Sequence, residues 1–199
     1  MLCGEASLFG GIEKRVYLLS AMNRSIIIKD KPFKPFIKHA DILLQVKKMA
    51  EEINVKHAND LPLFLVVLNG SFMFAADLLK EVNIPCEVSF VKLSSYSGTE
   101  SSLKIKELIG LNENLNQRHV VIVEDIVDTG HTIQNVRDMI LAKGAASVKI
   151  ASVFFKPEVY SKDLKIDYIG FEIPNNFVVG YGLDYDGLGR NLKDLHVLV

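Results

Sequence analysis

Two short stretches of the chain are apolar at every position. Residues 63–68 are LFLVVL and residues 120–123 are VVIV. Turn-forming residues border the first run, with Pro62 before it and Asn69-Gly70 after it. A strand that buries one face alternates between apolar and polar residues, so an uninterrupted apolar run predicts a strand covered on both faces. Strands of that kind are typical of parallel sheets, and this restricts the fold more than any other feature of the sequence.

The remaining sequence supplies helices and further strands around these two runs. Apolar residues at helical spacing predict helices over 40–54, 72–82 and 132–143. Asp41 or a neighbour is expected to cap the first helix, and Gly144 to end the third. Strands are predicted at 25–28, 87–93 and 148–155, with shorter candidates at 167–173, 177–181 and 195–199. Residues 31–35 (KPFKP) are expected to form a turn, because proline lacks the backbone donor of a strand.

Strands that alternate with helices predict an α/β fold with a central parallel sheet flanked by helices. A chain of 199 residues suits one domain, which we expect over 23–199. Residues 1–22 show no sustained period and are expected to be a weakly ordered or peripheral N-terminal extension. Ligands of such sheets bind outside the carboxyl ends of the strands. This rule selects residues 69–71 and 124–132 as candidate site segments.

Composition narrows the partners of the chain. The formal net charge is −1, from 23 basic and 24 acidic side chains, which excludes a broad electrostatic attraction to nucleic acid or to an anionic membrane. The sequence contains no apolar run of about 18 residues and no good signal peptide. Cys3 and Cys86 lack the spacing of a zinc site. We therefore expect a cytoplasmic protein with no nucleic-acid and no membrane partner, which binds any anion locally.

Residues 120–132, VVIVEDIVDTGHT, carry the strongest chemical signal. Free backbone N–H groups at a helix start bind anions, and Gly130 allows a phosphate to approach the backbone closely. Glu124 and Asp125 would repel that phosphate, and suit sugar hydroxyls or a magnesium ion instead. The segment therefore predicts a site for a phosphorylated sugar. In the simpler alternative, Asp128 or Thr129 only caps the helix and the acids are solvated.

This segment is similar to the phosphoribosyl-diphosphate (PRPP) signature of type I phosphoribosyltransferases. Together with FEIP at 171–174 and FVVGYGLDY at 177–185, it resembles the hypoxanthine-guanine branch of that family, and the resemblance extends over about 26–199. It implies a type I phosphoribosyltransferase fold, with a small hood formed by the N- and C-terminal segments and a flexible lid loop. It also implies purine salvage, in which N9 of a 6-oxopurine (hypoxanthine and/or guanine) displaces pyrophosphate from PRPP to give IMP or GMP.

The resemblance assigns roles at the sugar and the metal. Asp128 is the implied catalytic acid or base at purine N7. Glu124 and Asp125 would hold the ribose hydroxyls, and Mg²⁺ is the implied cofactor, with Asp184, Glu124 and Asp125 as its ligands. The 5′-phosphate would lie against a group of loop and helix-start residues: Asp128, Thr129, Gly130, His131 and Thr132.

The resemblance also assigns the purine, the pyrophosphate and the lid. Lys156 would donate to purine O6, while Phe177 stacks on the ring, Val178 binds its edge through the backbone and Asp184 lies nearby. Pyrophosphate would bind at Asn69, Gly70 and Arg190, with a cis peptide bond between Leu68 and Asn69. Many relatives carry Lys where this chain has Asn69, which leaves a side-chain role there open. Ser95 and Tyr96 would form the tip of the lid.

Other interpretations remain open at this point. One is a non-catalytic regulator that senses PRPP or a nucleotide on the same fold, and another is a xanthine-preferring phosphoribosyltransferase. The sequence does not rank hypoxanthine, guanine and xanthine. The family suggests a homodimer or a homotetramer.

Overall fold

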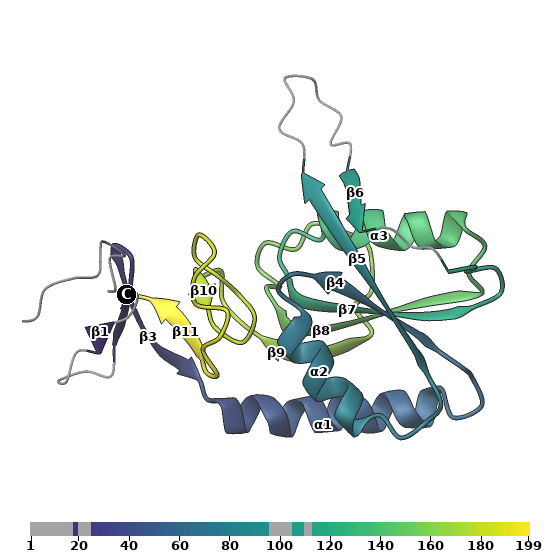
Figure 1. Cartoon of the computed structure of the whole chain (residues 1–199), viewed down its shortest axis with the longest axis horizontal. Helices are drawn as coiled ribbons and strands as arrows, with labels where there is room; N and C mark the ends of the chain where they lie inside the picture. Colours follow the sequence, from purple (N-terminus) through teal and green to yellow (C-terminus); the bar gives the residue numbers. More distant parts are fainter. Residues whose placement is uncertain (1–17, 20–24, 96–104, 110–112) are drawn as a thin grey trace, which may run out of the picture.

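The computed structural model of the chain describes residues 18–19, 25–95, 105–109 and 113–199 (Figure 1). It contains a six-stranded sheet with the order β6-β5-β4-β7-β8-β9 and a five-stranded sheet with the order β1-β2-β3-β11-β10. The main sheet is built from β4 (Leu63–Leu68), β5 (Glu87–Ser95), β6 (Ile105–Ile109), β7 (His119–Val127), β8 (Ser147–Phe155) and β9 (Tyr168–Glu172). Its strands β5, β4, β7, β8 and β9 are parallel, and β6 pairs with β5 in the antiparallel direction.

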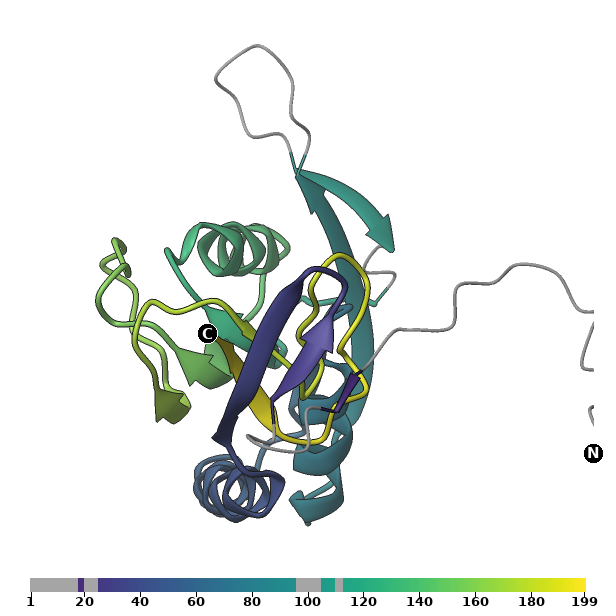
Figure 2. The ribbon, with the colours of Figure 1, turned by 90° about the vertical axis from the view of Figure 1, so that its left-hand side faces the viewer.

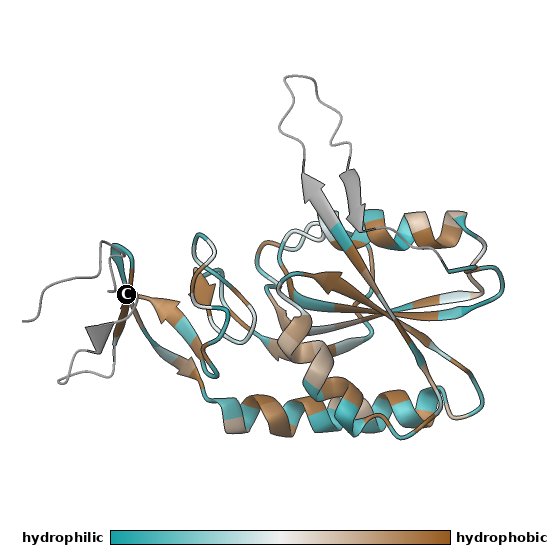
Figure 3. Cartoon of the chain, in the orientation of Figure 1, coloured by the Kyte–Doolittle hydropathy of each residue, from teal (hydrophilic) through white to brown (hydrophobic). Residues whose placement is uncertain are grey.

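Helices cover both faces of the main sheet. Side chains of α1 (His39–Lys56) and α2 (Phe72–Glu81) pack on one face with Phe64 and Val66 of β4. Side chains of α3 (His131–Ala142) pack on the opposite face with Leu65 and Val67. In Figure 3, α1 shows both apolar and polar colours along its length, as expected for a helix with one buried face. The α/β fold with a flanked central parallel sheet, and the buried strands at both apolar runs, are confirmed.

The second sheet forms a hood beside the first (Figures 1 and 2). It contains β1 (Leu18–Leu19), β2 (Ile26–Ile28), β3 (Lys31–Ile37), β10 (Val178–Val179) and β11 (Leu195–Leu198), all paired in the antiparallel direction. Segments from the two ends of the sequence therefore meet in one sheet, which confirms the expected hood. β1 lies within the expected N-terminal extension and pairs with β2. The division of the chain at residue 22 stays a prediction.

The turn expected over residues 31–35 is wrong, because these residues belong to β3. Pro32 is paired with Ile27 of β2, and Pro35 is paired with His196 of β11. The ladder between β3 and β2 stops at Phe33, and the carbonyl of Pro32 accepts the N–H of Val199 just after β11 ends. Each proline is thus in register with a neighbouring strand on one side only. A residue in such a position can lack its backbone N–H without breaking the sheet.

Of the two helix ends predicted from the sequence, one is confirmed and the other is not. The expected cap by Asp41 is wrong: α1 begins after Lys38, which makes no side-chain capping bond. Instead, the backbone N–H of His39 donates to Asp194 Oδ1 at 2.8 Å, from just before β11. Gly144 is confirmed as the residue that ends α3, with a φ of +86° just after Lys143. Among the described residues, no helix is long and apolar enough to cross a membrane.

Candidate active site

Glu124 and Asp125 lie near the carboxyl end of β7, and both are buried, at 9% and 8% exposure. Asp125 is held by the surrounding backbone: its Oδ1 accepts the N–H of Ile126 at 2.9 Å, and its own N–H donates to Ser71 Oγ at 3.1 Å. Burial raises the pKa of Asp125, and the Ile126 hydrogen bond opposes that rise. Asp125 is therefore fixed in place before any ligand binds.

Glu124 is the least satisfied carboxylate of the site. Its Oε2 atom is buried and has no hydrogen-bond partner within the described part of the chain. Burial raises the pKa of Glu124 well above its ordinary value, and the negative charge of Asp125 raises it further. The residue lines a small cavity of about 80 Å³, together with residues 126–133. A buried oxygen that lacks a partner suits a ligand hydroxyl or a cation.

The loop after β7 leads into α3 without a side-chain cap. Gly130 is the N-cap residue, with a φ of +84°, and the described residues supply no side-chain capping hydrogen bond there. The alternative in which Asp128 or Thr129 caps the helix is therefore wrong. A Cβ atom on Gly130 would lie 2.5 Å from Cε2 of Tyr160, so the loop approaches its neighbour more closely than an alanine allows. His131 and Thr132 are the first two residues of α3, and both are exposed.

Lys156 meets Asp128 at the ends of two neighbouring strands. Lys156 Nζ lies 3.2 Å from Asp128 Oδ1 and 3.3 Å from Oδ2. The lysine side chain is 8% exposed and the aspartate side chain 50%. The Lys156 N–H also donates to the Val127 carbonyl at 3.0 Å. The residues that the resemblance assigns to purine O6 and N7 are thus adjacent.

The segment after β4 packs directly on Asp125. The Leu68–Asn69 peptide bond is cis, as the resemblance implies. A Cβ atom on Gly70 would lie 1.5 Å from Asp125 Oδ2, so only glycine allows this approach. A Cβ atom on Gly182, which has a φ of +100°, would lie 1.9 Å from the Gly70 carbonyl oxygen. The predicted pyrophosphate loop therefore contacts both Asp125 and the loop after β10.

That loop brings Asp184 and Arg190 together. The Arg190 guanidinium lies 2.6 Å from Asp184 Oδ1, and its Nη1 donates to the Gly182 carbonyl at 2.7 Å. The second Asp184 oxygen accepts the N–H of Gly187 at 2.6 Å. The positive charge of Arg190 also lowers the pKa of Asp125, an effect smaller than that of burial. These predicted metal and pyrophosphate residues therefore belong to the same cluster as Gly70 and Asp125.

The predicted purine-stacking residue, Phe177, lies in the hood and is 45% exposed. Its ring centroid is 6.2 Å from that of Phe33 and 5.8 Å from that of Tyr185. Lys31 Nζ is 5.7 Å from the Phe177 centroid and 4.7 Å from the Tyr185 centroid. Val178 follows in β10 and is buried. Lys31 and Tyr185 were not predicted from the sequence, because their closeness to Phe177 depends on how distant segments of the hood pack together.

The predicted lid lies only partly within the described residues, and the predicted metal ligands do not form a complete site by themselves. Ser95 is the last residue of β5 and is in register with Ile105 of β6, while Tyr96 lies outside the described residues. Within the described ranges, no group of three or more His, Cys, Asp or Glu side chains could hold a metal ion. A magnesium ion at Glu124, Asp125 or Asp184 would therefore need oxygens from substrate or water, which is its usual form of binding.

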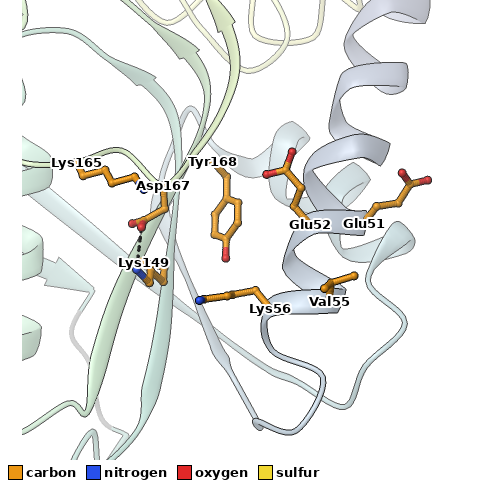
Figure 4. A pocket seen from close by; sticks show the side chains of 8 residues that line it. All are labelled: Glu51, Glu52, Val55, Lys56, Lys149, Lys165, Asp167 and Tyr168. Atoms are coloured by element: carbon orange, nitrogen blue, oxygen red, sulfur yellow. Dashed lines mark hydrogen bonds and ion pairs between the residues drawn. The ribbon is translucent and has the colours of Figure 1, made fainter.

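Figure 4 shows the lining residues of a second cavity, of about 540 Å³. It lies between the second half of α1 and the amino ends of β8 and β9, and contains none of the predicted site residues. Its lining carries both signs of charge, and Lys149 Nζ pairs with Asp167 Oδ1 at 2.9 Å. The cavity at the carboxyl ends of the strands is smaller. It is lined by Glu124, whose Oε2 atom has no hydrogen-bond partner among the described residues, and by the glycine loop and the first residues of α3.

Comparisons with known proteins agree with this geometry. Residues 37–186 match the family model described as a phosphoribosyl transferase domain. A hypoxanthine-guanine phosphoribosyltransferase from Streptococcus thermophilus is 41% identical over 159 residues, which cover 79% of this chain and 88% of that protein. The protein of the same name from Streptococcus pneumoniae is 42% identical over 166 residues, covering 83% and 92%. The solved structure of a hypoxanthine phosphoribosyltransferase from Staphylococcus aureus has a TM-score of 0.79 at 30% identity, and the match covers 83% of this chain and 91% of that one.

Proposed function

The chain belongs to the phosphoribosyltransferase family, and from this premise we propose that it transfers the phosphoribosyl group of PRPP to N9 of a 6-oxopurine. Hypoxanthine, guanine or both would be the accepting base, and the products would be IMP or GMP and pyrophosphate. Relatives at 41–42% identity carry the name of this activity. The observation that carries the proposal within this chain is the contact between Lys156 and Asp128, beside the glycine loop and the uncapped start of α3.

Lys156 and Asp128 suit the two sides of a 6-oxopurine. The Lys156 ammonium would donate to O6, and would disfavour adenine because an amino group in that place is itself a donor. Asp128 would take or share the proton at N7 as N9 forms its bond to C1 of the ribose. Positioned proton transfer of this kind is worth about 10²–10⁴ in rate. Phe177 would stack on the ring, and the backbone of Val178 would bind its edge.

The sugar phosphate would bind at the end of β7. The backbone N–H groups from Asp128 to Thr132 would surround the 5′-phosphate, since an uncapped helix start carries free donors and a positive dipole end. The hydroxyl of Thr129 would assist there. Glu124 and Asp125 would accept hydrogen bonds from the ribose hydroxyls, which would give the buried Glu124 Oε2 atom its missing partner.

Pyrophosphate leaves from the opposite side of C1, where Asn69, Gly70 and Arg190 would receive it. Negative charge develops on the leaving group in the transition state, and preorganised N–H donors and a guanidinium stabilise it. The donor set fits Mg²⁺, because Glu124 offers a buried oxygen without a partner in the described chain and Asp184 is a carboxylate near Arg190. When bound by Asp184, Glu124 and Asp125, the ion would neutralise charge on the pyrophosphate.

The assembly and location of the protein are part of the proposal. Phe72 of α2 and Val88 and Phe90 of β5 are exposed, at 41–46%. Val88 and Phe90 are in register with Phe64 and Val66, so they lie on the sheet face that α1 and α2 cover. Exposed apolar side chains of this kind support a homodimer or homotetramer. We propose a cytoplasmic location and only small-molecule substrates, and light scattering in solution would measure the assembly.

One assay tests the proposal. The protein is mixed with PRPP and Mg²⁺ and with hypoxanthine, guanine, xanthine or adenine in turn, and nucleotide and pyrophosphate are measured. We expect product from hypoxanthine or guanine, little from adenine, and loss of turnover when a chelator removes the metal. Product from xanthine alone would replace the proposed substrate. Binding of PRPP without product from any base would indicate a sensing protein instead.

A further inference from the structure

Ser71 joins two strands at the point where their pairing ends. The ladder between β4 and β7 stops at the pair Val66 and Val123. Beyond it, the Ser71 hydroxyl donates to the Val67 carbonyl at 2.6 Å and accepts the N–H of Asp125 at 3.1 Å. The side chain is fully buried. One hydroxyl therefore bridges β4 and β7 where the backbone ladder no longer does.

The bridge lies between the residues assigned to pyrophosphate and the residue assigned to the ribose, and these two groups separate in the reaction. Ser71 directly follows Asn69 and Gly70, and Gly70 packs against Asp125 so closely that a Cβ atom there would lie 1.5 Å from Asp125 Oδ2. Asp125 lies beside Glu124 at the predicted ribose position. The Ser71 hydroxyl thus ties the pyrophosphate loop to the ribose carboxylate.

We propose that Ser71 is a positioning residue, which fixes the distance between the pyrophosphate loop and Asp125 through its hydrogen bond to the Asp125 N–H. This inference rests on the proposed function. The bond that breaks joins C1 of the ribose to pyrophosphate, so the two binding elements must hold their groups at a set separation. Displacement of a bound group by about 1 Å can cost about 100-fold in rate.

The first test is Ser71→Ala, which removes one oxygen and leaves the Val67 carbonyl and the Asp125 N–H without their partner. We expect kcat/KM for PRPP to fall about tenfold or more, because the loop and the carboxylate lose their fixed spacing. The KM for hypoxanthine should change by less than about twofold, since Lys156 and Asp128 lie on the other side of the site. Amide hydrogen exchange should accelerate at Asp125.

Two further variants separate positioning from general stability. Ser147→Ala removes a hydroxyl bonded to His119 Nδ1 at 2.8 Å, at the amino ends of β7 and β8, and should leave kcat/KM for PRPP within about twofold of the original. Ser71→Cys keeps the size of the side chain with a weaker donor and acceptor, and should lie between serine and alanine. It also serves as the test if Ser71→Ala does not fold.

The outcomes are distinct. If the unaltered protein makes no nucleotide, the proposed function falls and this inference falls with it. If the protein is active and Ser71→Ala keeps its kcat/KM for PRPP, the inference alone is overturned. A rise in KM for hypoxanthine as large as the fall in kcat/KM for PRPP, or the same fall in Ser147→Ala, would also overturn it, because either result describes general destabilisation.

Discussion

Lys156 Nζ lies between the two carboxylate oxygens of Asp128, at 3.2 and 3.3 Å, with the lysine buried and the aspartate half-exposed. Val127 and Phe155, which precede these residues, are in register in β7 and β8. The pairing of two neighbouring strands therefore brings a cation and a carboxylate together at one edge of the sheet. A cation and a carboxylate thus lie close enough to contact one planar base.

Lys156→Met tests the cationic half of this pair. Loss of a charge-assisted hydrogen bond to O6 costs about 1.5–3 kcal/mol, so the KM for hypoxanthine should rise about 10- to 150-fold, and the preference over adenine should fall. The KM for PRPP should change little. Steady-state kinetics with each base measures this.

Lys149→Met is the matched control. Lys149 lies at the start of the same strand and pairs with Asp167 at 2.9 Å, at the opposite edge of the sheet. Removal of this pair should cost at most about 1 kcal/mol of stability and leave KM unchanged. An equal rise of KM in both variants would contradict the assignment of Lys156 to the base.

Asp128→Asn tests proton transfer. Asparagine keeps the shape of the side chain but cannot take the N7 proton, so kcat should fall about 10²- to 10⁴-fold. The affinity for PRPP, measured by calorimetry, should change less than about threefold, because backbone N–H groups would hold the phosphate in the proposed site. Full turnover in this variant would show that another group moves the proton.

Glu124 predicts how the stability of the unliganded protein depends on pH. Burial raises its pKa well above the ordinary value of 4.5, so above pH 4.5 the folded state binds more protons here than the unfolded state does. Stability therefore falls as pH rises from about 4.5 through the raised pKa. Glu124→Gln should remove this contribution and make the protein more stable at neutral pH, while turnover falls.

Urea unfolding at several pH values, with and without the substitution, measures this difference. Glu51→Gln, which removes an exposed carboxylate of α1, is the control and should keep the original pH slope. If Glu124→Gln instead destabilises the protein at neutral pH, the folded chain stabilises the charged carboxylate, and Glu124 Oε2 is not held ready for a ligand.

Local sequence predicted the parts of the site whose geometry is local. The apolar run at 120–123, the acids after it and Gly130 before a helix were enough to predict a strand, a loop and an uncapped helix start. The buried run at 63–68 likewise predicted β4. A strand that is buried on both faces is apolar at every position, so it can be predicted without knowing which strands lie beside it.

Contacts between distant segments were the part that the sequence could not provide. The start of α1 is bonded by Asp194, which is 155 residues from His39 in the sequence, and not by Asp41. Ser71 bonds Asp125, which is 54 residues away in the sequence. The error at β3 has the same origin, because a proline is compatible with a strand only where no neighbour needs its N–H, and that depends on the strands beside it. Strand order, which local patterns do not encode, decides all three.

Gly130 and Gly187 allow the strain of the phosphate loop to be measured. Both have positive φ, +84° and +82°, but a Cβ atom on Gly130 would meet Tyr160 and Lys162, whereas nothing lies within 4 Å of one on Gly187. Gly187→Ala should therefore lower the free energy of unfolding only by the cost of the left-handed conformation, about 1–2 kcal/mol. Gly130→Ala should lower the free energy of unfolding by more, because the Tyr160 ring must also move, and it should raise the KM for PRPP. Urea unfolding of both variants measures the difference, and equal destabilisation would show that Tyr160 yields freely and does not support the loop.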